Sequence, residues 1–245
     1  MKKFYSRAAA GIAVFFVAVC FFSCKSYPPD FEVSDFYSQY SNTVAFSESK
    51  KYIEIRPADS QVKSDTGIIF YPGGLVEYKD YIPLLTLFAQ KGITCVIVKM
   101  PLDFAIFDIG AAGKITGQFP QVKSWYIGGH SLGGAMAASY TARHQEDFEG
   151  LILLAAYSTH DLSDSGLKVL SIYGSKDGVL NMKRYQKYKK NLPSVGKGLT
   201  EIIIDGGNHG QFANYGAQKG DYMPEISRDE QQKITAEEII NWAGF

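Results

Sequence analysis

The sequence has no surplus of positive charge, because its 25 lysine and arginine residues are matched by 25 aspartate and glutamate residues. It also has no long run of like charges, so it lacks the basic surface that would neutralise nucleic-acid phosphates. We therefore do not expect a nucleic acid as a partner. The 46% hydrophobic content is typical of a globular protein rather than a disordered one, and a length of 245 residues is compatible with one domain.

Cysteine and histidine are scarce. Of the three cysteines, Cys20 and Cys24 lie near the N-terminus and Cys95 lies in the apolar run ITCVIV. If the first two leave with a leader peptide or carry a lipid, no intramolecular disulfide can form even in an oxidising compartment. We interpret Cys95 as a small buried hydrophobic residue on a strand. The four histidines are isolated in the sequence, so no metal-binding cluster is indicated.

Only the N-terminus carries a long uncharged run, and this run is short for a membrane span. Three basic residues within positions 2–7 precede Ala8–Phe22, and Ser23 and Cys24 follow. A run of about 15 residues is shorter than the roughly 20 that cross a bilayer as a stable helix. This layout is typical of a secretory signal, so we predict a signal peptide over residues 1–23 and export of the protein.

The ending FFSC of this segment resembles a bacterial lipoprotein signal, in which Cys24 becomes the lipid-modified first residue of the mature chain. The resemblance implies a lipoprotein tethered to a membrane of a bacterial cell envelope. Phe22 is bulkier than the residue usually found at its position. Two alternatives therefore stay open, namely ordinary cleavage, which would give a secreted or periplasmic protein, and an uncleaved anchor.

The rest of the chain divides into a short tether and one domain. Residues 24–42 are polar and aromatic, and Pro28-Pro29 disfavours regular structure, so we predict a tether there. Residues 43–245 contain no repeats and no second linker. In this part, short β-branched or aromatic runs alternate with helix-like stretches, which predicts an α/β domain with a mostly parallel sheet and helices on both faces.

The expected elements can be given by residue range. The expected strands are Thr43–Phe46, Tyr52–Arg56, Gly67–Tyr71, Thr94–Lys99, Ser124–Ile127, Gly150–Ala155, Lys168–Tyr173 and Glu201–Ile204. The expected helices are Tyr78–Gln90, Phe104–Thr116, Gly133–His144, Val179–Asn191 and Thr235–Trp242. No helix separates the first two strands, so we expect them to form an antiparallel pair. In such sheets ligands bind beyond the carboxyl ends of the strands, and the site is expected there.

The run GGHSLGGAMAA places Ser131 between a predicted strand and a predicted helix. The motif G-x-S-x-G in this context positions a nucleophile on a sharp turn. Ser131 must then adopt a strained backbone conformation, and side chains two residues before and after it would collide. Gly129 and Gly133 remove that collision. The alternative is a plain glycine-rich turn without a nucleophile.

A serine hydroxyl is a weak nucleophile, so a histidine must take its proton. His209 follows the apolar strand EIII in the loop DGGNHGQF, which brings it to the same edge of the sheet as Ser131. We predict His209 as the base. We interpret the remaining histidines as solvated or locally hydrogen-bonded, namely His130, His144 and His160.

An acid must orient the base. Asp177 follows the strand VLSIY in the turn GSKDG, between Ser131 and His209 in the chain, and we predict that it is this acid. A turn-forming aspartate is the structural alternative for this position. Asp161 and Asp164, after the sixth strand, are alternatives, whereas Asp205 also ends a strand but lies too close in sequence to His209 for the usual geometry.

Backbone amides are expected to hold the oxyanion of the reaction. One is the amide of Leu132 at the start of a helix, where the helix dipole also helps. The other comes from the run PGGL after the third strand, with the amide of Gly74 as our choice and that of Leu75 in reserve. Apolar residues that follow the strand ends would form a substrate rim, although each is equally credible as core: Val76, Leu102, Tyr157, Val179 and Phe212.

The order Ser131, Asp177, His209 along the chain, each at a strand end, resembles the α/β-hydrolase superfamily over residues 43–245. The runs FYPGG, VKMPL and GGHSLGGAMAA resemble the compact bacterial group that is similar to dienelactone hydrolases. This resemblance implies the α/β-hydrolase fold with an eight-stranded sheet, and neither a metal nor an organic cofactor. Dienelactone hydrolases use a cysteine nucleophile, so the serine found here favours esterase-type chemistry.

Only about a dozen residues, Ser158–Leu167, separate the sixth and seventh strands, which is too few for a lid domain. The open site suits short acyl groups or an exposed ester on a larger molecule. We therefore expect a serine hydrolase that cleaves a carboxylic ester through an acyl-enzyme. The alternatives are an acyltransferase, a thioesterase or an amidase on the same residues, and, from another class, a non-enzymatic surface-binding lipoprotein.

Overall fold

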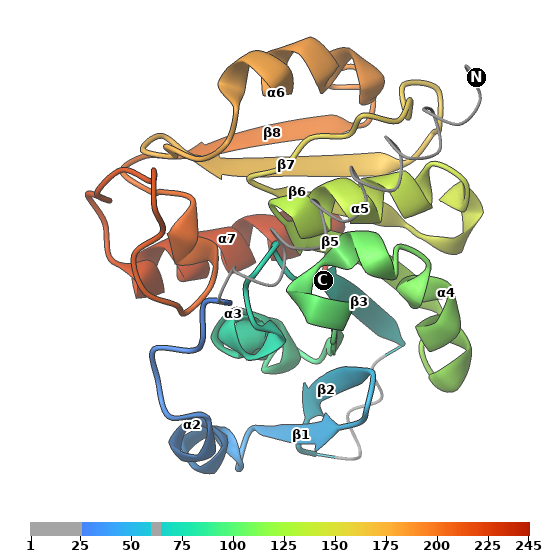
Figure 1. Ribbon diagram of the computed structural model, residues 1–245. Helices are drawn as coiled ribbons and strands as arrows, with labels where there is room; N and C mark the ends of the chain where they lie inside the picture. The colour runs from blue at the N-terminus through green and yellow to red at the C-terminus, as the bar shows by residue number, and fades with distance from the viewer. Residues whose placement is uncertain (1–25, 60–64) are drawn as a thin grey trace, which may run out of the picture.

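The computed structural model describes residues 26–59 and 65–245, and one eight-stranded sheet forms the centre of the molecule (Figure 1). The strand order is β1-β2-β4-β3-β5-β6-β7-β8. β2 is antiparallel to both β1 and β4, and the strands from β3 to β8 are parallel to one another. The strands are β1 (Val44–Glu48), β2 (Tyr52–Pro57), β3 (Thr66–Tyr71), β4 (Thr94–Val98), β5 (Ser124–His130), β6 (Gly150–Leu154), β7 (Lys168–Gly174) and β8 (Leu199–Ile204).

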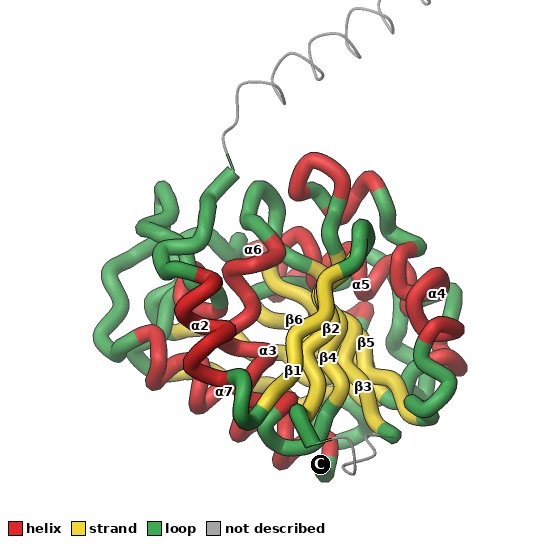
Figure 2. The backbone as a smooth tube through the Cα atoms, turned by 90° about the horizontal axis from the view of Figure 1, so that it is seen from below, coloured by secondary structure: helices red, strands yellow, loops and turns green. Residues whose placement is uncertain are grey.

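Helices cover both faces of the sheet. α2, α3 and α7 pack on one face and α4 and α5 on the other (Figure 2). α6 lies beyond β7, where its Tyr185 packs against Tyr173 and Leu180. The helices are α2 (Val33–Tyr40), α3 (Ile82–Ala89), α4 (Ala111–Ile115), α5 (Leu132–Thr141), α6 (Met182–Tyr188) and α7 (Arg228–Ala243).

The central strands are continuous apolar runs because helices bury them from both sides. Along β3, Ile68 and Phe70 point into the core cluster under α3 and α7, whereas Ile69 and Tyr71 point into the cluster under α4 and α5. This alternation follows from the two-residue period of a strand. The hydrophobic pattern therefore determines which side chains of a strand pack on each face of the sheet. The loops at the strand ends are not part of this packing and can form a site.

The predicted α/β fold is confirmed, including the antiparallel first pair and all eight predicted strands within a few residues of their predicted ends. The chain between β6 and β7 forms no helix or strand, so the lidless architecture is confirmed as well. Two helix predictions need correction. Residues 104–116 contain only the five-residue α4 and short 3₁₀ turns, and the last helix begins at Arg228 rather than at Thr235.

The segment predicted as an extended tether contains a helix from Val33 to Tyr40. The adjacent residues Phe36 and Tyr37 both contact Phe46 on β1, at ring-centroid distances of 6.3 and 4.3 Å. The aromatic residues thus supply an apolar helix face, which outweighs the effect of the prolines that precede it. The predicted signal peptide and Cys24 lie outside the described residues. Within the described residues, no helix has the length and apolar character needed to span a membrane.

Candidate active site

Ser131 occupies a strained turn between β5 and α5. Its backbone has φ 53° and ψ −121°, a conformation that costs a non-glycine residue free energy and that concentrates at functional sites. Its amide donates to the carbonyl of Leu154, at 2.9 Å, which ties the turn to the neighbouring strand. The turn therefore has the strand-to-helix geometry that the sequence motif predicts.

Two glycines make this turn possible. A Cβ on Gly129 would lie 2.6 Å from the carbonyl oxygen of Tyr71, and one on Gly133 would lie 2.1 Å from the same oxygen. Both distances are shorter than any side chain tolerates, so α5 can approach β3 only because these positions have no side chain. The close approach places Ser131 beside the loop that follows β3.

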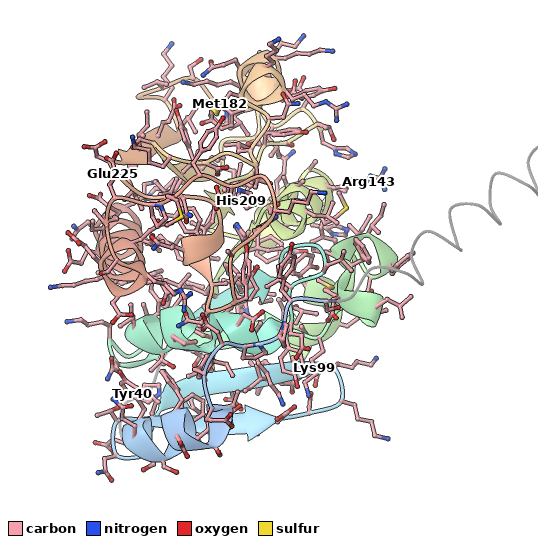
Figure 3. The ribbon with its side chains drawn as sticks, turned by 60° about the vertical axis from the view of Figure 1, so that its left-hand side comes forward. Tyr40, Lys99, Arg143, Met182, His209 and Glu225 are labelled. Atoms are coloured by element: carbon pink, nitrogen blue, oxygen red, sulfur yellow. The ribbon has the colours of Figure 1, made fainter. Side chains whose placement is uncertain are left out.

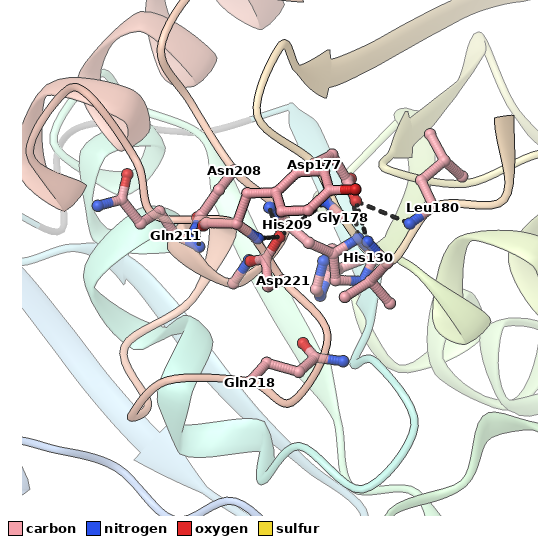
Figure 4. Close-up of polar contacts among 12 residues, drawn as sticks. His130, Asp177, Gly178, Leu180, Asn208, His209, Gln211, Gln218 and Asp221 are labelled. Atoms are coloured by element: carbon pink, nitrogen blue, oxygen red, sulfur yellow. Dashed lines mark hydrogen bonds and ion pairs between the residues drawn. The ribbon is translucent and has the colours of Figure 1, made fainter.

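His209 and Asp177 form a buried pair (Figure 4). Nδ1 of His209 lies 2.9 Å from Oδ2 of Asp177, and both side chains are 1% exposed. The other carboxylate oxygen of Asp177, Oδ1, accepts hydrogen bonds from the amides of Val179 and Leu180, at 2.9 and 2.7 Å. The carboxylate is thus held by its own turn while it faces the imidazole.

Ser131 and His209 line the same cavity, which has a volume of about 360 Å³. Nε2 of His209 is buried and has no hydrogen-bond partner among the described residues. The pairing of Nδ1 with a carboxylate favours the tautomer in which Nε2 carries the lone pair. The other residues that line the cavity are Leu132, Ala135, Met136, Ala155, Ala156, Tyr157, Thr159, Val179, Leu180 and Asn181.

Backbone strain concentrates at the edge of the sheet where this cavity lies, and two of the strained residues, Ser131 and Ala155, line the cavity. Among the described residues, the non-glycine residues with positive φ are Leu75, Leu102, Asp103, Ser131 and Ala155. All five follow the carboxyl ends of β3, β4, β5 or β6. Strained backbone persists only where the surrounding structure enforces it, and it gathers at active sites. The strain therefore marks the same edge of the sheet as the paired side chains do.

The two residues whose amides we predict for an oxyanion, Gly74 and Leu132, are in contact. A Cβ on Gly74 would lie 3.5 Å from Cβ of Leu132. In the described part of the chain, neither amide donates a hydrogen bond to another group. The reserve choice, the amide of Leu75, is occupied because it donates to the carbonyl of Asp103 at 2.8 Å. Of these three amides, those of Gly74 and Leu132 are thus available to a ligand.

The residues predicted for the rim, each equally credible as core, divide between the cavity, the surface and the core. Tyr157 and Val179 line the cavity, and Leu102 is exposed but does not line it. Val76 and Phe212 are buried in the core. Val76 is drawn inward because it forms a bridge with Tyr27 of the N-terminal segment, a contact that the local sequence does not signal.

The other histidines differ in their surroundings. His144 stacks on Tyr140 at a ring-centroid distance of 4.2 Å, and His160 lies in a polar loop at the surface. His130 is instead 1% exposed and lies 4.5 Å from the ring of His209, between ring centroids. Burial, together with the neighbouring His209, holds the pKa of His130 well below its usual value. His130 is therefore not solvated, and it packs against His209 and is locally hydrogen-bonded to Tyr81.

Tyr81 connects this histidine to the loop after β3. Its hydroxyl oxygen accepts from the amide of Gly73 and lies 2.9 Å from Nδ1 of His130. A Cβ on Gly73 would lie 2.9 Å from that hydroxyl oxygen, so a side chain at this position would displace the tyrosine or the loop. The tyrosine thereby fixes the loop that carries the amide of Gly74.

Asp221 is a residue that the sequence analysis did not identify. Its Oδ1 accepts from the amides of Gly178 and His209, at 3.0 and 3.3 Å, and its Oδ2 accepts from the amide of Gly210 at 2.9 Å. Asp221 thus connects the turn of Asp177 to the loop of His209 (Figure 4). It lies in the irregular run AQKGDYMP, which carries no motif or periodicity.

The other aspartates considered for the acid lie in other surroundings, and Asp164 is exposed in the loop after β6. Oδ1 of Asp205 accepts from the hydroxyl of Ser175 at 3.0 Å, and Asp161 accepts from the backbone and the hydroxyl of Ser163 at the surface. Among the described residues, no cluster of three or more histidine, cysteine or acidic residues could hold a metal ion.

A model of the alpha/beta hydrolase family matches residues 67–233. No curated protein matches the sequence. Among solved structures, Est1E from Butyrivibrio proteoclasticus superposes with a TM-score of 0.58 at 13% identity, covering 83% of this chain and 100% of that one. Esterase Est2 from the planctomycete Thermogutta terrifontis gives a TM-score of 0.58 at 15% identity, covering 84% and 94%.

The family match includes the loops of Ser131, Asp177 and His209 and most of the sheet. The two solved structures have the same fold over most of both chains. The protein is therefore a hydrolase and belongs to the alpha/beta hydrolase family.

Proposed function

We propose that this protein is a serine hydrolase that cleaves a carboxylic ester through an acyl-enzyme, with Ser131 as nucleophile, His209 as base and Asp177 as acid. The observation that carries the proposal is the buried pair of His209 and Asp177, at 2.9 Å, beside a strained serine that lines the same cavity. A nucleophile, a base and a group that orients the base are the minimum that this chemistry requires.

In the first half of the reaction, Oγ of Ser131 attacks the ester carbonyl while Nε2 of His209 accepts the hydroxyl proton. Asp177 then stabilises the imidazolium through Nδ1–H. The amides of Gly74 and Leu132 donate to the oxygen that becomes negative, and the N-terminus of α5 adds its dipole. His209 returns the proton to the departing alkoxide, which leaves as an alcohol, and the acyl group stays on Ser131.

In the second half, His209 takes a proton from water, and the resulting hydroxide attacks the acyl carbon. The same amides of Gly74 and Leu132 hold the second oxyanion. Its collapse releases the carboxylic acid and returns the proton from His209 to Oγ of Ser131. No group besides this chain and water is needed to balance the reaction.

The cavity supports a small acyl group. Its volume of about 360 Å³ and its largely apolar lining suit a short aliphatic or a single aromatic acid. Two structures that resemble this chain agree with this size class, since Est2 has been solved with bound butyrate and Est1E with ferulic acid. Est2 has also been solved phosphoramylated by tabun, which is the reactivity that we propose for Ser131.

The first experiment is labelling by a fluorophosphonate probe, followed by a panel of p-nitrophenyl esters of increasing acyl length. The wild type should label and should prefer short esters, whereas Ser131→Ala should do neither. Ser163→Ala is the matched control, since this half-buried serine pairs with Asp161 and does not line the cavity, and it should behave as the wild type. Labelling of Ser131→Ala at the wild-type level would refute the assignment.

Product analysis separates hydrolysis from transfer and from other leaving groups. With an ester substrate and added alcohol or amine acceptors, a hydrolase releases the free acid, whereas an acyltransferase forms the new ester or amide. Thioester and amide substrates with the same acyl group should react more slowly than the oxygen ester. A binding protein without activity would leave all of these substrates intact.

We also propose that the protein is exported and that Cys24 carries a lipid, which the run FFSC supports. The protein expressed in a bacterial host should then partition into the detergent phase of a phase-separation assay, and Cys24→Ala should move into the aqueous phase. Equal partitioning of the two proteins would contradict lipidation.

A further inference from the structure

The described chain begins at the edge of the sheet that carries the candidate active site. Oγ of Ser26 donates to Oδ2 of Asp103 at 2.5 Å. The amide of Tyr27 donates to the carbonyl of Leu75 at 2.7 Å, and the amide of Glu77 donates back to Tyr27 at 3.2 Å. The N-terminal segment is therefore paired with the loop that carries the amide of Gly74. We call this edge, at the carboxyl ends of β3 to β8, the carboxyl edge.

Exposed apolar side chains gather on the same edge. Leu102 is 69% exposed and follows β4, as do Ile106 and Phe107, and Met182 follows β7. Tyr222 and Met223, at 65% and 85% exposure, lie in the loop whose backbone packs on Gly178 after β7. Among the described residues, only Val195 and Ile203 are large, apolar, exposed and placed elsewhere. In a monomer such a concentration marks a surface that contacts another apolar phase.

A basic cavity of about 400 Å³ adjoins this surface, and its apolar floor includes Val98 and Met100 at the end of β4. Lys99 pairs with Glu48, and Lys114 pairs with Asp108. Lysines nevertheless outnumber the acids there, since the lining also includes Lys50 and Lys51. Figure 3 labels Lys99 and Met182 on either side of His209. Lysines around an apolar floor suit an anionic lipid headgroup above acyl chains.

We propose that the carboxyl edge docks on the surface of a lipid bilayer with anionic headgroups, so that the candidate active site faces the membrane. The uncharged run Ala8–Phe22 and Cys24 precede Ser26 in the sequence. Two residues span at most about 7 Å, so an anchor at Cys24 holds this edge, and no other, against the bilayer. The exposed apolar side chains then enter the interface, and the lysines meet its headgroups.

This orientation assigns a substrate class. Provided that the proposed serine hydrolase activity is correct, the natural ester lies in or at the membrane surface, with its carbonyl within reach of Ser131. The docking surface itself depends on the exposed side chains and on the position of Ser26, and it does not depend on catalysis. The two proposals can therefore fail separately.

The test reads orientation with tryptophan probes in the full chain, reconstituted into vesicles of phosphatidylethanolamine and brominated phosphatidylglycerol. Ile106→Trp and Met223→Trp place the probe on the carboxyl edge. Val195→Trp is the matched control, because Val195 is also exposed, at 66%, but precedes β8 at the opposite edge. Side chains that enter the interface lie about 5–10 Å below its surface, so we expect the edge probes to be quenched at least about twofold more than the control.

Three outcomes would overturn the docking surface: no quenching of either edge probe, equal quenching at both edges, or a shift of the edge-probe emission that depends on protein concentration without vesicles. The last would identify a second copy of the chain as the occupant. If the edge probes are quenched but no ester is cleaved, the docking surface stands and the proposed activity fails.

A kinetic test addresses the substrate class. The double variant Ile106→Ser, Met223→Ser should lose turnover of an ester embedded in vesicles by about tenfold, since each apolar side chain contributes to interfacial binding. Its turnover of a soluble p-nitrophenyl ester should not change, because neither residue lines the cavity of Ser131. Val195→Ser should retain both activities. Equal loss on both substrates would contradict a membrane-bound ester.

Discussion

At the scale of the residue, the proposed chemistry depends on one imidazole whose two nitrogens have different surroundings. Nδ1 of His209 faces a carboxylate at 2.9 Å, whereas the buried Nε2 has no partner among the described residues. A buried nitrogen without a partner costs free energy. This cost is expected where a substrate or a nucleophile supplies the missing hydrogen bond to Nε2. The imidazole keeps its position despite the cost because the contact with Asp177 holds the ring.

Asp177→Asn tests this arrangement. The amide oxygen can still accept from Val179 and Leu180, as Oδ1 does now, so the fold should be retained. The amide cannot stabilise the imidazolium, and it favours the wrong tautomer of His209. We expect turnover of a p-nitrophenyl ester to fall by about 10³–10⁴-fold, as such changes do in related triads. Steady-state kinetics and thermal unfolding measure both effects.

Asp205→Asn is the control for that substitution. Asp205 also follows a strand, but its Oδ1 accepts only from Ser175, so turnover of this variant should remain within a few-fold of the wild type. A larger loss in Asp205→Asn than in Asp177→Asn would move the acid to the end of β8.

At the scale of the element, the proposed acid Asp177 and the proposed base His209 lie on separate loops, after β7 and β8, that must keep a fixed distance. Asp221 connects them by accepting from Gly178, His209 and Gly210. Asp221→Ala should therefore separate the loops without removing a reacting group. A displacement of about 1 Å costs about 100-fold in rate, so we expect a loss of this order in kcat with little change in KM.

Two readouts distinguish this positioning role from general destabilisation. Asp221→Asn retains one acceptor oxygen and should recover part of kcat, and the pH profile of kcat should shift in Asp221→Ala because the His209–Asp177 contact loosens. Gln218→Ala, in the same loop, removes a contact with Tyr215 only and should keep the wild-type profile. Equal losses in the Asp221 and Gln218 variants would contradict the connection.

The sequence predicts the elements that follow local rules. β3 and β4 are apolar runs bounded by turn residues. The sharp turn at Ser131 requires glycines because side chains would collide there. Both features are therefore recognisable from spacing alone. The Asp221 contacts and the inward position of Val76 arise from segments that are distant in sequence. No local pattern encodes such pairings, which explains why the sequence indicates Asp177 and His209 as candidates but does not indicate Asp221, which connects their loops.

At the scale of the whole molecule, a buried acid links stability to pH. Asp80 is fully buried, and neither of its carboxylate oxygens has a partner among the described residues. Burial, with nearby Glu77 and Asp30, raises its pKa to about 9. Between about pH 4 and pH 9, the folded protein therefore keeps the proton on Asp80, whereas the unfolded chain has lost it. The free energy of unfolding consequently decreases as pH rises through this range, by up to about 1.4 kcal/mol per pH unit.

Asp80→Asn removes this proton equilibrium and leaves a neutral side chain of the same shape. We expect the free energies of unfolding of the variant and the wild type to differ least near pH 5. As pH approaches 8, the variant should become the more stable of the two. The reason is that only the wild type must either hold a proton against the rising pH or bury a charged carboxylate. Urea unfolding at a series of pH values measures how steeply the free energy of unfolding changes with pH in each protein. The difference between these slopes is independent of any fixed cost of the amide.

Asp229→Asn, at the exposed start of α7, controls for the change in net charge. If the free energies of unfolding of Asp80→Asn and the wild type change with pH in parallel, Asp80 ionises normally inside the fold. The charged carboxylate would then require a bound partner that balances its charge.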